Sequence, residues 1–148
     1  MPSINQSALV MFSPQQMYDI VADIEVYPRF LNWCRDAKIV EQVDNGVVAK
    51  IDIDYKGIKQ SFTTKNVNEN AKSIIMSLHG DQGSFEHLGG GWNFLSIDME
   101  GQQACKVEFN LDFSMNNKIT ATIFKTFFQK IVHSQVDGFI KRAEELYK

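Results

Sequence analysis

The histidines and cysteines are the residues best suited to metal or nucleophilic chemistry, and their spacing argues against both. His79, His87 and His133 do not follow the H-x-x-x-H or H-E-x-x-H pattern of zinc sites. Cys34 and Cys105 lie far apart and show no C-x-x-C spacing. We therefore expect no metal, no cofactor and two unpaired thiols, which suits a reducing compartment.

Two further segments have the composition of a chemical site. The glycines at 89–91 do not form G-x-G-x-x-G, and the residues after them predict a strand, whereas a phosphate loop needs a helix N-terminus behind it. We interpret them as a flexible turn or gate. Asp23 and Glu25 are interpreted as capping or solvating a loop rather than as a catalytic carboxylate pair.

An aromatic segment over 27–34 is harder to explain as ordinary surface loop. Tyr27, Phe30, Leu31 and Trp33 crowd a stretch that carries no periodic pattern. Loops usually run over the surface, so these side chains must be buried against something. They either plug the core or line one end of a ligand cavity. The same alternatives hold for Trp92, Phe94 and the aromatic stripe of the last predicted helix.

The first elements predicted to position these residues are a strand and a capped helix at the start of the chain. Residues 4–10 alternate loosely and predict a strand. Ser13, Pro14 and Gln16 form a capping-box signature with proline at the first helical position. Pro28 is expected to end the helix, because the residue before a proline disfavours helical geometry.

Six further strands are predicted from alternating apolar and polar residues. Their expected ranges are 37–43, 47–56, 58–64, 73–79, 92–99 and 104–113. The Asn45-Gly46 pair and the turn around Gly57 are typical of tight hairpins. Strict alternation predicts an antiparallel sheet with one wet face.

Residues 119–147 change to helical periodicity without an interrupting proline. We expect one continuous helix roughly 43 Å long, in which Gly138 costs about 1 kcal/mol unless close packing requires it. The fold class predicted is α+β: a single helix-grip domain over 1–148, in which a curved antiparallel sheet wraps around a long C-terminal helix. An incomplete grip leaves an elongated apolar cavity between them.

Composition restricts the classes of partner. The chain has 148 residues, is 44% hydrophobic and carries a net charge of −3, so it lacks a general basic footprint for DNA or anionic membranes. It contains no apolar run of about 18 residues, so we expect no transmembrane segment. The N-terminus lacks the basic and apolar regions of a signal peptide. We expect a soluble, cytoplasmic protein.

The aromatic segment and its surroundings carry a family resemblance. The stretch from residue 17 to residue 34 has the pattern Met17-Tyr18-x-x-Val21-x-Asp23-x-x-x-Tyr27-Pro28-x-Phe30-Leu31-x-x-Cys34. This pattern resembles the opening motif of the coenzyme Q-binding protein and ribosome association toxin family. That family lies within the START-like, polyketide cyclase/dehydrase superfamily. Three later segments are similar to the same family: Gly90-Gly91-Trp92-x-Phe94, the strand from Cys105 to Phe113, and Phe139-x-x-Arg142-Ala143-x-x-x-Tyr147. Met1-Pro2-x-Ile4 and Gly57-Ile58 look closest to the bacterial toxin branch.

The sequence also departs from the family pattern. Asn32 stands where many members have proline, and residues 81–87 are more polar than expected and lack a basic residue. The resemblance implies a helix-grip fold with a hydrophobic cavity, a lipid or quinone ligand, and no shared catalytic set. For the toxin branch it also implies binding to the large ribosomal subunit, which blocks subunit joining.

Three functions are weighed. The first is noncatalytic binding of a ubiquinone-like lipid, in support of respiratory quinone function. Ten residues are predicted to line its cavity: Tyr27, Phe30, Trp33, Tyr55, Phe62, Trp92, Phe94, Phe109, Phe124 and Phe128. Tyr55 or Arg35 could donate a hydrogen bond to a quinone head.

The second function is ribosome binding through the outer surface, for which Lys56, Lys59 and Lys65 could serve. The negative net charge counts against it, because rRNA binding draws on phosphate neutralisation. The third is a polyketide-type cyclase, which would need inward acid or base groups. The inward positions are nearly all apolar, so the enzyme ranks last. Six residues are predicted to be buried: Ile51, Ile53, Phe62, Phe109, Leu111 and Phe128.

Overall fold

The computed structural model describes residues 3–55, 57–80, 85–115 and 118–148, and the side chains of residue 58 and residues 118–125 lie outside this description. Its elements are β1 (Ser3–Val10), α1 (Pro14–Ala22), the 3₁₀ helix η1 (Ile24–Arg29), β2 (Cys34–Val43), β3 (Gly46–Tyr55), β4 (Ile58–Glu69), β5 (Ser73–Leu78), β6 (Phe85–Met99), β7 (Gln102–Met115), α2 (Lys118–His133) and α3 (Gln135–Tyr147). None of the described helices is long and apolar enough to cross a bilayer.

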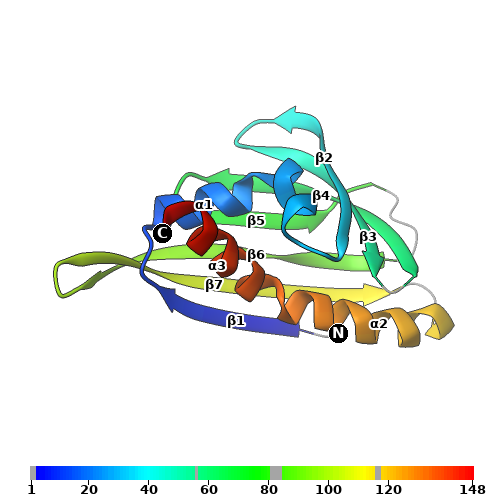
Figure 1. Cartoon of the computed structure of the whole chain (residues 1–148). Helices are drawn as coiled ribbons and strands as arrows, with labels where there is room; N and C mark the ends of the chain where they lie inside the picture. The colour runs from blue at the N-terminus through cyan, green and yellow to red at the C-terminus, as the bar shows by residue number, and fades with distance from the viewer. Residues whose placement is uncertain (1–2, 56, 81–84, 116–117) are drawn as a thin grey trace.

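The strands form one antiparallel sheet in the order β1-β7-β6-β5-β4-β3-β2. Figure 1 shows this curved sheet with α2 and α3 lying across it, and α1 packs against α3 near the C-terminus. Apolar side chains of β3 and β7 alternate inward and are buried. The predicted α+β helix-grip fold is confirmed.

The start of α1 is as predicted, and its end is not. The Ser13 hydroxyl accepts a hydrogen bond from the Gln16 amide (3.1 Å), and the Gln16 side chain accepts one from the Ser13 amide (2.9 Å). The helix ends at Ala22, six residues before Pro28, which instead lies inside η1. The Tyr27 hydroxyl donates to the Val21 carbonyl, and so satisfies one of the carbonyls that the helix end leaves open.

The triple glycine is neither a turn nor a gate, contrary to our interpretation. It lies within β6, and its residues pair with β5 on one side and β7 on the other. A Cβ atom on Gly90 would lie 2.1 Å from the Asn110 carbonyl oxygen, so only glycine fits the backbone approach here. Because glycine has no side chain to show alternation, the sequence pattern begins only at Trp92, seven residues after the strand does.

The C-terminal helix is divided at Ser134 rather than continuous. At this position the Ser134 hydroxyl donates to the Ile131 carbonyl (2.8 Å), and the Ser134 amide is shared between the Lys130 and Ile131 carbonyls. In α3, a Cβ on Gly138 would lie 2.8 Å from Cδ2 of Leu31. The glycine therefore allows the aromatic segment to pack closely against the helix. Close packing of this kind was the predicted reason for a glycine inside the helix.

The predicted core is largely confirmed. Ile51, Ile53, Phe109, Leu111 and Phe128 are buried, whereas Phe62 is only half-buried. Both cysteines are buried and unpaired, as predicted. Lys56, the Phe124 side chain and residues 81–84 of the polar stretch lie outside the described residues.

Candidate functional site

A cavity lies between the inner face of the sheet and the junction of α2 and α3. Within the described part of the chain its free volume is about 70 Å³. It is lined by Ile24, Tyr27, Trp33, Ala49, Ile51, Phe62, Thr64, Asn66, Met76, Leu88, Trp92, Phe109, Leu111, Phe128, Ile131, Val132 and Gln135. This volume is far below the roughly 300–1,000 Å³ of ordinary ligand pockets. The elongated cavity that we predicted is present in this part of the chain only as a small one.

Six of the ten predicted lining residues surround this cavity: Tyr27, Trp33, Phe62, Trp92, Phe109 and Phe128. The rings of Trp92 and Phe109 are 4.4 Å apart, and the rings of Phe62 and Phe128 are 6.3 Å apart. Side chains from β4, β6, β7 and α2 therefore meet at one place, as their alternation predicted.

The other predicted residues lie elsewhere or outside the description. Phe30 packs 5.6 Å from Phe139, under the guanidinium of Arg142, and Phe94 packs 5.9 Å from Tyr18. The ring of Tyr55 lies 5.9 Å from that of Phe127.

The two suggested hydrogen-bond donors are not found at this cavity. Arg35 is exposed at an irregularity of β2, and neither Arg35 nor Tyr55 is among the lining residues described. The polar groups of the cavity wall come from other positions.

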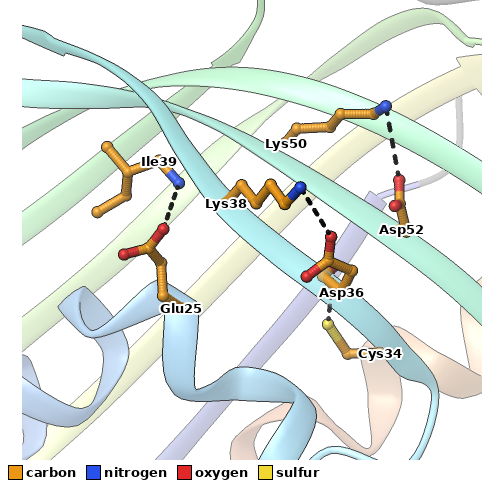
Figure 2. Close-up of polar contacts among 7 residues, drawn as sticks. All are labelled: Glu25, Cys34, Asp36, Lys38, Ile39, Lys50 and Asp52. Atoms are coloured by element: carbon orange, nitrogen blue, oxygen red, sulfur yellow. Dashed lines mark hydrogen bonds and ion pairs between the residues drawn. The ribbon is translucent and has the colours of Figure 1, made fainter.

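The aromatic segment is held in place by contacts to the edge strand β2. Figure 2 shows Glu25 reaching from η1 to β2, where its carboxylate accepts a hydrogen bond from the Ile39 amide (3.2 Å). The Cys34 thiol contacts the Asp36 carbonyl oxygen at 3.5 Å. Because β2 is the last strand of the sheet, Glu25 also occupies an amide that would otherwise be open to another chain. The Trp33 carbonyl accepts a hydrogen bond from the Asp54 amide of β3 (3.0 Å), which ties the end of the aromatic segment to the sheet.

The sequence analysis missed a polar patch on the cavity wall. Thr64 and Asn66 on β4 are only 3% and 5% exposed, and the Thr64 hydroxyl donates to the Asn66 side-chain oxygen (2.8 Å). Gln135 lies at the same cavity from the start of α3. The signal was the alternation of β4, which places 62, 64 and 66 on one face. We ended that strand at residue 64, whereas it continues to Glu69.

Tyr27 in the cavity wall and the two buried thiols are uncharged at neutral pH. Burial raises the pKa of Tyr27 far above its usual value. Burial, followed by the charges of Asp36 and Asp52, raises the pKa of Cys34 to about 12, and burial raises the pKa of Cys105 to about 11. The thiolate is the nucleophilic form, so these thiols are inert at neutral pH. No cluster of potential metal ligands occurs among the described residues.

The amino-acid sequence is similar to a known family and to several named proteins. A family model described as polyketide cyclase / dehydrase and lipid transport matches residues 10–140. The persistence and stress-resistance toxin PasT of Escherichia coli O6:H1 is 39% identical, and the ribosome association toxin RatA of E. coli K12 is 38% identical; each match covers 99% of this chain and 90% of the relative. The mitochondrial coenzyme Q-binding protein COQ10 homolog B of Xenopus laevis is 25% identical, over 97% of this chain and 58% of that protein.

Solved structures show the same architecture. The Zhui aromatase/cyclase from Streptomyces sp. R1128 has a TM-score of 0.84 at 12% identity, over 99% of this chain and 96% of that one. A START superfamily protein from Mycobacterium smegmatis has a TM-score of 0.79 at 18% identity, over 97% of this chain and 98% of that one. At such low identities the likeness concerns the fold alone.

Proposed function

The chain belongs to the polyketide cyclase/dehydrase and lipid transport family, and from that premise we propose that it binds a hydrophobic, ubiquinone-like ligand without catalysing a reaction. The observation that carries this proposal is the cavity between sheet and helices, whose wall is aromatic and aliphatic with a few polar groups. Such a wall is typical of sites for apolar molecules.

The polar groups of the cavity favour binding over catalysis. Cyclisation and dehydration need a group that exchanges protons near neutral pH. Tyr27 is held neutral by burial and donates its hydroxyl hydrogen to the Val21 carbonyl. Thr64, Asn66 and Gln135 are not titratable. The described wall therefore offers hydrogen bonds rather than an acid or a base.

The small volume sets a condition on binding. About 70 Å³ holds only a few water molecules. A quinone ring needs more, so its binding requires cavity side chains to move apart. Filling the existing space should consequently oppose binding.

A titration with decylubiquinone tests the proposal. Phe128→Trp adds volume where the rings of Phe62, Phe85 and Phe113 converge on α2, and should weaken binding at least about tenfold. Leu95→Trp places the same side chain at an exposed position of β6 and should leave the affinity unchanged. Absence of binding to the wild-type protein, or equal binding by all three proteins, would overturn the proposal.

A second candidate function is association with the ribosome, and by the family resemblance with its large subunit. The observation that favours it is the identity of 37–38% over 99% of the chain to proteins named as ribosome association toxins. It would use the outer surface, so it is compatible with an occupied cavity.

The described surface gives this second function limited electrostatic support. Lys38 and Lys50 form ion pairs with Asp36 and Asp52 (Figure 2). The nitrogen–oxygen distances are 3.8 and 4.0 Å, and the corresponding distance from Lys106 to Glu108 is 3.7 Å. Lys59 and Lys65 are exposed at separate positions on β4. Sedimentation of the protein with purified large subunits in sucrose gradients tests the idea. Migration only at the top of the gradient, at low salt, would exclude it.

A further inference from the structure

Trp33 carries a buried hydrogen-bond donor that has no partner among the described residues. Trp33 is 6% exposed and lines the cavity, and its indole Nε1 is the atom without an acceptor. Leaving such a donor unpaired costs folding free energy. A phenylalanine would avoid that cost at a position that needs only aromatic bulk.

The other polar side chains of the cavity wall are also of a kind that recognises a neutral oxygen. Asn66 uses its side-chain oxygen to accept from Thr64 and retains an amide group with two N–H donors. Gln135 adds a further amide to the same wall. No Lys, Arg or His occurs among the lining residues described. A buried carboxylate or phosphate would therefore lack a counter-charge, which makes its burial costly.

We propose that the Trp33 indole N–H and the Asn66 amide form a polar subsite of the cavity, which opens when the cavity side chains move apart and accepts an uncharged carbonyl oxygen of the ligand. The inference rests on the proposed function and specifies its ligand class. The preferred ligands are apolar molecules that carry a ketone, quinone or ester carbonyl, in preference to pure hydrocarbons and to ionised fatty acids.

A matched pair of small probes isolates this subsite. Duroquinone and durene share a ring with four methyl groups, and only duroquinone has carbonyls. The measured quantity is the affinity for duroquinone divided by the affinity for durene, obtained by titration calorimetry. In Trp33→Phe this ratio should fall about tenfold, because a single hydrogen-bond donor to the quinone carbonyl has been removed. Tyr18→Phe is the control: it removes a hydrogen-bond donor from a buried aromatic side chain that is not among the described lining residues, and it should keep the wild-type ratio.

A direct spectroscopic reading accompanies the titration. The chain has two tryptophans, so a ¹H–¹⁵N spectrum contains two indole signals, and Trp33→Phe assigns them and also reports whether the fold is kept. Duroquinone should move the Trp33 indole proton downfield, and durene should not.

The outcomes separate the two proposals. If both probes bind and the ratio is the same in all three proteins, or if the Trp33 indole signal does not respond to duroquinone, the carbonyl subsite is refuted while the binding cavity stands. That is the result expected if a structural water satisfies the indole. If neither these probes nor decylubiquinone binds the wild-type protein, both proposals fall.

Discussion

The side chain of Phe109 belongs both to the hydrophobic core and to the cavity wall. Its ring lies 4.4 Å from that of Trp92 and is 4% exposed, yet it also borders free space. Phe109→Ala should lower the free energy of unfolding by about 3–5 kcal/mol, because packed contacts are lost and the cavity enlarges. Urea denaturation measures this loss. Ile75→Ala, at an exposed position of β5, should change it by less than about 0.5 kcal/mol. A loss below about 1 kcal/mol for Phe109→Ala would show that its ring is not packed.

The two cysteines predict how stability depends on alkaline pH. Their pKa values rise to about 12 and 11 in the folded protein, against roughly 8.5 in an unfolded chain. The folded state therefore holds protons that the unfolded state releases, and the unfolding free energy is lost as pH rises from about 9 towards 11. Each thiol contributes up to about 1.4 kcal/mol per pH unit. Urea denaturation at several pH values should show a shallower decline for a Cys34→Ala, Cys105→Ala double variant. Equal slopes in the two proteins would contradict the assigned burial.

At the scale of single elements, the contact between α3 and the aromatic segment predicts that Gly138→Ala changes the unfolding free energy in opposite directions in two backgrounds. Gly138→Ala improves helix propensity by about 1 kcal/mol, but its Cβ would press on buried Leu31. In the wild-type background we expect a net loss of about 1 kcal/mol in unfolding free energy, from overpacking. In a Leu31→Ala background the same change should stabilise the protein, because the opposing atoms are gone. A stabilising effect in both backgrounds would show that the packing is looser than described.

Some elements of the fold could be predicted from the sequence, and others could not. β3 and β7 were predicted because one face is wet and the other buried, which imposes alternation. The first half of β6 was missed because Gly89, Gly90 and Gly91 carry no side chains. The break at Ser134 was not predicted because no proline or glycine stands at that position. The polar patch of the candidate site was not predicted because Thr64 and Asn66 are buried among side chains from distant parts of the chain.

For the molecule as a whole, we propose that the sheet and the divided helix enclose a binding space rather than a plain core. Buried polar side chains at that space, and an indole donor without a partner among the described residues, favour a binding space. Ribosome association, the second proposed function, would use the outer surface, where several lysines lie beside carboxylates. The two surfaces can therefore be tested independently.

Mass spectrometry of small molecules that copurify with the protein shows whether the cavity holds a ligand. Wild-type protein and Phe128→Trp would be purified without detergent and extracted with organic solvent, and the lipids compared in equal amounts of protein. We predict a neutral, carbonyl-bearing lipid such as a quinone in the wild-type extract, and a severalfold smaller amount with Phe128→Trp. A wild-type extract free of lipid, or one whose lipid content is unchanged by Phe128→Trp, would contradict the claim that this cavity is the binding site.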